Sequence, residues 1–139
     1  MSRASAAGSF APRTDGPARP PVVLALVGPT GAGKTSVSLA VAPGLRAEIV
    51  GVDSMQVYRG MDVGTAKASA EERRRVPHHL IDIADPGKPF SVAAFQGAAR
   101  AAVDAILLRG RVPLLAGGSG LYYRAVVDDL EFPPTDPSL

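Results

Sequence analysis

Blocks of apolar residues alternate with mixed, helix-compatible stretches along most of this chain. The apolar runs are short and nearly continuous, which is typical of strands buried on both faces of a sheet. The stretches between them carry apolar residues at helical spacing. We expect strands at 22–27, 48–52 and 112–116, a helix at 36–42 that Pro43-Gly44 ends, a helix that Ser91 caps and Gly110 ends, and a short helix that ends near Val127. The alternation predicts an α/β fold, a parallel sheet flanked by helices.

Local patterns add two weaker elements and a candidate core. Ser69 and Glu72 have the spacing of a capping box, so a short helix is expected to begin there and to end before Pro77. Residues 79–83 are compatible with a strand. One face of the helix after Ser91 is apolar and is expected in the core: Val92, Phe95, Ala99, Ala102 and Ile106.

Composition divides the chain at about residue 22. Residues 1–21 are rich in Ala, Ser, Gly, Pro and Arg, and we expect a disordered leader there. Residues 22–139 carry 12 basic and 12 acidic side chains, so they lack the basic field that attracts nucleic acid. The absence of cysteine excludes disulfides and thiolate chemistry, and no apolar run approaches the roughly 20 residues that span a bilayer. We expect a cytoplasmic monomer with no membrane segment.

The clearest motif follows the first strand. Its eight residues fit the phosphate-loop pattern of Gly, four free positions and Gly-Lys-Thr: Gly28, Pro29, Thr30, Gly31, Ala32, Gly33, Lys34 and Thr35. Glycines let successive amide N–H groups turn toward one anion, and the following helix points its positive end at the same place. Lys34 adds a charge, and the Thr35 hydroxyl suits a phosphate-bound Mg²⁺ ion. The motif predicts a nucleotide or other polyphosphate site, since a turn that merely ended a strand would not need Lys34 and Thr35.

Small or polar residues also follow the other two main strands. Asp53, Ser54, Met55 and Gln56 come after the second strand, and the glycine-rich turn at 117–120 comes after the last. Because the carboxyl ends of parallel strands meet at one edge of a sheet, we expect a single active-site crevice there. Asp53 is a candidate general base, a carboxylate that holds magnesium through water, or an aspartate that caps a turn.

The turn at 117–120 is informative because no acidic residue precedes it. Phosphate-loop ATPases usually end a buried strand with a carboxylate, so the sequence argues against an ATP-hydrolysing motor or switch. Ser119 either offers its hydroxyl to a ligand or belongs to a helix-entry loop. His78 and His79 are expected to pack or form hydrogen bonds rather than bind zinc. Residues 71–75 are a solvated helix face or a contact for RNA phosphates.

Taken in order, these motifs resemble the tRNA dimethylallyltransferase family. The resemblance runs from about Val22 to Leu130 and is most specific in the Asp-Ser-x-Gln-Val-Tyr-Arg segment that begins at Asp53. That segment separates the family from small-molecule kinases that share the phosphate loop. The matching segments are 28–35, 53–67, 76–82 and 117–122. The resemblance implies a P-loop NTPase-like fold and a transferase core over 22–139 that is truncated at its C-terminus.

The resemblance also implies a reaction and its residues. A dimethylallyl group would pass from dimethylallyl diphosphate to N6 of the tRNA adenosine beside the anticodon. The phosphate loop would hold the diphosphate leaving group rather than ATP, with Thr35 near Mg²⁺. Asp53 and Ser119 would be catalytic, with Asp53 as the base that accepts the amine proton. The residues in contact with tRNA would be Asp53, Ser54, Met55, Gln56 and Ser119, which stands where the family usually has threonine.

Family members are longer than this chain, and their later half supplies the surface that grips the anticodon stem-loop. We therefore expect a diphosphate pocket with little or no transfer to tRNA by this chain alone. Three other interpretations stay open: a small-molecule kinase that uses ATP, with Asp53 activating a hydroxyl; a transferase that acts on free adenine nucleotide; and a non-catalytic fragment that binds phosphate.

Overall fold

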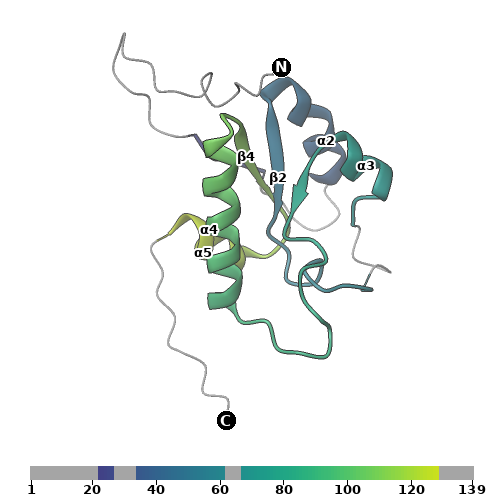
Figure 1. The fold of residues 1–139 in the computed structure, drawn as a ribbon, viewed down its shortest axis with the longest axis vertical. Helices are drawn as coiled ribbons and strands as arrows, with labels where there is room; N and C mark the ends of the chain where they lie inside the picture. Colours follow the sequence, from purple (N-terminus) through teal and green to yellow (C-terminus); the bar gives the residue numbers. More distant parts are fainter. Residues whose placement is uncertain (1–21, 27–33, 62–66, 129–139) are drawn as a thin grey trace.

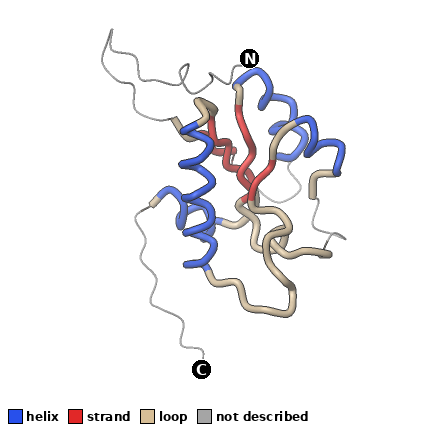
Figure 2. Tube along the Cα trace, in the orientation of Figure 1, coloured by secondary structure: helices blue, strands red, loops and turns tan. Residues whose placement is uncertain are grey.

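The computed structural model describes residues 22–26, 34–61 and 67–128. Figures 1 and 2 show three layers, with α4 and α5 on one face of a central sheet and α2 and α3 on the other. The elements are β1 (Leu24–Leu26), α2 (Lys34–Leu45), β2 (Ala47–Gly51), α3 (Ala70–Arg75), β3 (His78–His79), α4 (Val92–Leu108), β4 (Val112–Ala116) and α5 (Gly120–Val127). In this described part of the chain, no helix combines the length and apolarity needed to cross a bilayer.

The sheet has four strands in the order β1-β4-β2-β3, and every neighbouring pair is parallel. β4 lies between β1 and β2, with Leu114 opposite both Leu24 and Ile49. All of β2 is buried, as expected of a strand covered on both faces. The predicted parallel sheet flanked by helices is confirmed.

Alternate residues of the two central strands face opposite layers and form two separate cores. Ile49 and Leu114 pack beneath α2, against Leu39 and Ala42. The neighbouring residues Val50 and Leu115 belong to the other core, beneath α4 and α5. The predicted apolar face of α4 lies in that second core, where its fully buried members are Phe95, Ala99 and Ile106. Burial of such side chains contributes roughly 1.5–3 kcal/mol each for the larger ones.

Two serines begin helices as predicted. The N–H of Glu72 donates to Ser69 Oγ at 3.1 Å, and the Glu72 carboxylate accepts from the Ser69 N–H at 2.8 Å, which completes a capping box for α3. At the start of α4, Ser91 Oγ accepts from the N–H of Ala94 at 3.0 Å. Each bond satisfies an amide that has no partner within its helix. No residue of α3 is buried. Arg73 pairs with Asp82, and a contact between the exposed charges of this stretch and RNA phosphates stays a prediction.

The first helix continues three residues beyond its predicted last residue, 42. The sequence places the end at Pro43-Gly44, but α2 includes both residues and stops at Leu45. Pro43 stands in the last turn, where the missing N–H removes only one helical hydrogen bond. The helix ends because Arg46 adopts a left-handed φ of 54° and donates its N–H to the Pro43 carbonyl at 3.2 Å.

The strand predicted at 79–83 is also wrong in extent. Only His78–His79 form β3, which pairs with β2. Leu80 and Asp82 then adopt φ values of 68° and 59°. This left-handed backbone cannot continue a strand, so the chain leaves the sheet after His79.

The loop after β4 approaches the end of β2 more closely than a side chain would allow. A Cβ on Gly117 would lie 2.4 Å from the carbonyl oxygen of Val52. Val52 also donates its N–H to the Ala116 carbonyl at 3.0 Å and accepts the Ser119 N–H at 3.1 Å. Gly117 therefore allows the ends of two strands to join, and α5 starts from that junction.

Replacing Gly117 with Ala tests this close approach. The added methyl would collide with backbone, so we expect Gly117→Ala to lower the free energy of unfolding by about 2–3 kcal/mol. Gly120→Ala is the matched control, because a Cβ there has no neighbour within 4 Å. It should change stability by less than about 1 kcal/mol. Urea unfolding of both variants measures the difference, and equal stabilities would contradict the steric argument.

Candidate active site

The carboxyl ends of the parallel strands meet at one edge of the sheet, as their common direction requires. β1 ends at Leu26, just before the predicted phosphate loop. Residues 28–33 of that loop and the side chain of Lys34 lie outside the described residues, so their assignment stays a prediction. Thr35, the predicted magnesium ligand, lies exposed in the first turn of α2.

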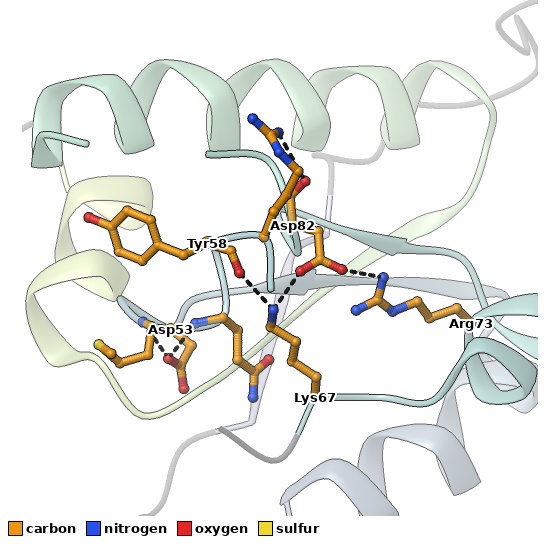
Figure 3. Close-up of polar contacts among 8 residues, drawn as sticks. Asp53, Tyr58, Lys67, Arg73 and Asp82 are labelled. Atoms are coloured by element: carbon orange, nitrogen blue, oxygen red, sulfur yellow. Dashed lines mark hydrogen bonds and ion pairs between the residues drawn. The ribbon is translucent and has the colours of Figure 1, made fainter. Parts of the chain in front are cut away.

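Asp53 stands two residues past β2 and caps the turn that follows (Figure 3). Its Oδ1 accepts hydrogen bonds from the N–H groups of Met55 at 2.8 Å and Gln56 at 3.1 Å. Among the described residues, no hydrogen bond or ion pair engages Oδ2. The turn-capping interpretation is thus confirmed, and the cap leaves Oδ2 available for another interaction.

Ser119 lies next to Asp53 across the junction of β2 and β4, because its N–H is bonded to the Val52 carbonyl. It precedes α5 in the position that Ser69 and Ser91 occupy at their helices, yet its side chain makes no capping hydrogen bond. The turn is therefore a helix-entry loop that does not use the Ser119 hydroxyl. Asp53 and Ser119, predicted from separate strand ends, do come together at one edge.

Two buried tyrosines of α5 connect this edge to the core, and the sequence patterns give no reason to assign them a role. The hydroxyl of Tyr123 lies 2.7 Å from the carbonyl oxygen of Leu115 and 2.9 Å from that of Leu26. One phenol thus ties α5 to β4 and to the end of β1. Burial raises the pKa of Tyr123 to about 12, against a smaller opposite effect of the bond to Leu26. Tyr122 stacks on Phe95 with ring centroids 3.9 Å apart.

An ion-pair network lies beside the Asp53 turn (Figure 3). Lys67 Nζ donates to the Tyr58 carbonyl at 2.7 Å and to Asp82 Oδ1 at 2.5 Å, and Arg73 Nη1 donates to Asp82 Oδ2 at 3.0 Å. Burial opposes ionisation of Asp82, but the hydrogen bonds and charges of Lys67 and Arg73 outweigh it and lower its pKa. Sequence reasoning missed this network, because no periodic pattern links charges 15 positions apart.

The two adjacent histidines have separate hydrogen-bond partners, as predicted for neighbours in an extended segment. His78 Nδ1 lies 2.7 Å from the Val76 carbonyl, and His79 Nε2 lies 2.7 Å from Glu48 Oε1. Burial lowers the pKa of His78. Glu48 lies at the amino end of β2, so His79 is turned away from the Asp53 edge. Within the described ranges, no three His, Asp or Glu side chains are grouped to hold a metal.

Comparison with known proteins connects this geometry to a family. A family model described as IPP transferase matches residues 56–139, and one described as isopentenyl transferase matches residues 21–82. The chain belongs to the IPP transferase family. The resemblance drawn from the sequence motifs is thereby confirmed.

Several curated relatives of this IPP transferase chain share one name. The tRNA dimethylallyltransferase of Salinispora arenicola is 62% identical over 117 residues, which cover 84% of this chain and 34% of the relative. That of Moorella thermoacetica is 59% identical over 117 residues, which cover 81% of this chain and 36% of the relative. The chain thus spans roughly a third of the length of these relatives.

Solved structures confirm the fold class of the IPP transferase chain. The full-length tRNA isopentenylpyrophosphate transferase of Bacillus halodurans matches with a TM-score of 0.76 and 50% identity, over 86% of this chain and 40% of that one. A eukaryotic dimethylallyltransferase acting on tRNA matches with a TM-score of 0.76 and 28% identity, over 81% and 28% of the two chains. The fold is P-loop NTPase-like, as predicted.

The link that Tyr123 makes between α5 and two strands predicts a loss of stability at alkaline pH. The folded pKa of about 12 lies above the ordinary value of 10.0, so the phenol stabilises the fold fully below pH 10. That contribution is lost as pH rises from 10 toward 12, at a cost of up to about 2.5 kcal/mol. Tyr123→Phe should lose correspondingly less over the same range, as denaturant unfolding would show.

The same variant has a second expected effect near pH 7. Without the hydroxyl, the carbonyls of Leu26 and Leu115 lose a donor, and we expect Tyr123→Phe to be about 1–2 kcal/mol less stable. Tyr122→Phe is the matched control, because its hydroxyl is bonded to neither strand, and it should cost less. An alkaline loss in Tyr123→Phe equal to that of the unsubstituted protein would contradict the assignment.

Proposed function

We propose that this chain carries the diphosphate-binding and catalytic part of a tRNA dimethylallyltransferase. One observation carries the proposal: Asp53 and Ser119 lie side by side at the sheet edge where the phosphate-loop motif begins. Asp53 Oδ2 is unused by the turn and the Ser119 hydroxyl is unused by the helix. The name of the relatives, tRNA dimethylallyltransferase, supports the same assignment.

The proposed reaction assigns a step to each group. The N6 amine of a tRNA adenosine attacks the first carbon of the dimethylallyl group, the bond from that carbon to the diphosphate oxygen breaks, and Asp53 accepts the amine proton. Negative charge grows on the departing diphosphate, so the phosphate-loop amides and Lys34 provide the largest stabilisation. Ser119 and residues 54–56 contact the acceptor nucleoside.

Mg²⁺ is the cofactor that fits this proposal. Magnesium prefers oxygen ligands, keeps several waters, and usually binds through substrate phosphates with only one or two protein oxygens. Thr35 is an exposed residue in the first turn of α2, and its hydroxyl is a suitable protein ligand of that kind. When bound, the ion neutralises charge on the diphosphate, while Thr35 and Lys34 orient the leaving group.

The ranking of ligands separates this function from that of an ATP-dependent kinase. In the presence of Mg²⁺, we expect dimethylallyl diphosphate to raise the melting temperature of the chain more than ATP does at equal concentration. At a hundredfold excess over Kd, binding to the folded state alone stabilises it by about 2.7 kcal/mol. Thermal unfolding with each ligand, and with inorganic diphosphate as a reference, measures the ranking. The reverse order would favour the kinase.

The base role of Asp53 predicts different results for two substitutions. Asp53→Asn keeps an oxygen for the Met55 and Gln56 amides but cannot take a proton, whereas Asp53→Ala removes both functions. We expect Asn to lower transfer by about 100-fold or more while leaving diphosphate affinity and stability nearly unchanged. Alanine should also cost roughly 1 kcal/mol of stability.

Because weak RNA binding is expected to leave this chain with little transfer at ordinary concentrations, transfer is best measured as a single turnover on an anticodon stem-loop RNA with protein in large excess. Ser119→Ala is a comparison variant, because it should lower the rate of transfer without changing the hydrogen bonds of the Asp53 turn. Full transfer by Asp53→Asn would rule out the base role and leave Asp53 as a turn cap.

A further inference from the structure

The turn that carries Asp53 belongs to no helix and to no strand of the sheet. Residues 56–59 are held instead by a distant segment of the chain, 82–84, through backbone hydrogen bonds. The N–H of Asp82 donates to the Gln56 carbonyl at 3.0 Å, and the N–H groups of Ile83 and Ala84 both donate to Val57. The conformation of the turn after Asp53 therefore depends on where residues 82–84 are fixed.

Two side chains join these segments: Arg59 Nη1 donates to the Asp82 carbonyl at 3.5 Å, and the buried Lys67 bonds both sides. Its Nζ bonds the Tyr58 carbonyl at 2.7 Å and Asp82 Oδ1 at 2.5 Å, so one ammonium holds both sides of the contact. The Lys67 side chain is only 5% exposed. An ammonium that is buried to this degree is stable only when it is paired and hydrogen-bonded, and such charge-assisted bonds are short and directional.

The backbone of Asp82 shows that this arrangement is imposed on the chain. Its φ of 59° is a left-handed conformation that costs energy in a residue other than glycine. The conformation turns the carboxylate so that Lys67 and Arg73 bind its two oxygens. Arg73 comes from α3, so the network also anchors the turn to a helix (Figure 3).

We propose that Lys67 is a positioning residue for the acceptor side of the active site. Lys67 holds the Tyr58 carbonyl against Asp82 and so fixes the turn at residues 53–58. In that turn, Asp53 Oδ1 accepts from the Met55 and Gln56 amides, and these bonds set the direction of Oδ2. The catalytic importance of the Oδ2 orientation rests on the proposed transferase function. The role of Lys67 in holding the turn does not depend on that function, and the turn-holding role and the transferase function are tested separately.

Local amide exchange tests the turn-holding role. Lys67→Met keeps the length of the side chain and removes its charge and its donors. We expect the amides of Met55 and Gln56 to exchange with water on the order of tenfold faster in this variant, measured by solvent-exchange NMR. The slowly exchanging core amides of β4 should change much less. Lys88→Met is the matched control, since Lys88 is 79% exposed, and it should change neither group.

A second variant and a binding measurement complete the test. Asp82→Asn keeps the size of the side chain and weakens the pair, so it should accelerate exchange at Met55 and Gln56 by a smaller factor than Lys67→Met. The Kd for inorganic diphosphate should stay within twofold of the unsubstituted value in all variants, because the network lies on the acceptor side.

The outcomes separate the positioning role from general stability. Unchanged exchange at Met55 and Gln56 in both network variants would overturn the proposal. An equal acceleration of those amides and of the β4 core would also overturn it, because it would reveal only global destabilisation. Failure of the unsubstituted chain to bind diphosphate would count against the proposed transferase function instead, and the exchange comparison would still decide the role of Lys67.

Discussion

The closeness of Gly117 to Val52 is the constraint on which the rest of the site depends. A Cβ at position 117 would stand 2.4 Å from a backbone oxygen, so only glycine lets the chain leave β4 in this direction. With that approach, both the N–H and the carbonyl of Val52 are bonded to the loop after β4. Asp53 is the next residue after Val52, and the Ser119 N–H donates to the Val52 carbonyl. Their proximity is therefore a consequence of backbone packing, and neither side chain has to create it.

At both edges of the sheet, a buried charged side chain is paired with several partners of opposite charge or with hydrogen-bonding groups. Glu48, at the amino end of β2, is 3% exposed and pairs with Nε2 of His79 at 2.7 Å, Nη2 of Arg109 at 2.5 Å and Nε of Arg111 at 3.1 Å. Burial opposes its ionisation, but the hydrogen bonds and charges of Arg109 and His79 prevail and lower its pKa. A buried ion persists only when several partners compensate its desolvation. The Lys67 network obeys that rule at the opposite edge.

The sequence predicts those parts of the fold whose cause is local. Ser69 and Ser91 cap helices because each needs only amides within three positions, and the apolar runs around Ile49 and Leu114 specify buried strands by themselves. The strand expected at 79–83 fails because Leu80 and Asp82 both adopt a left-handed backbone, and the Asp82 carboxylate is held by Lys67, 15 positions away. No local pattern encodes such a contact.

In the candidate site too, residues whose placement has a local cause were predictable and the others were not. Asp53 and Ser119 were predictable, because any residue just past a parallel strand lies at the carboxyl edge of the sheet. The turn-capping role of Asp53 was one of the alternatives, and the hydrogen bonds from the amides of Met55 and Gln56 confirm it. Tyr123 and Lys67 were not predictable, because each acts through backbone carbonyls that are distant in sequence. The phosphate loop stays a prediction of the motif.

Strand order has a consequence for the proposed chemistry. β4 separates β1 from β2, and neighbouring strands lie about 4.8 Å apart, so the end of β1 and the Asp53 turn stand roughly 10 Å from each other. At that separation, the carboxylate repels a diphosphate held after β1 only weakly. The space is also of the right order for a five-carbon group and an attacking amine in line with the breaking bond. Ser119, which follows the strand in between, lies where the reacting atoms would meet. With the proposed base after β2 and the proposed leaving group after β1, one strand would stand between them, which suits a transfer in which the proton and the diphosphate depart in opposite directions.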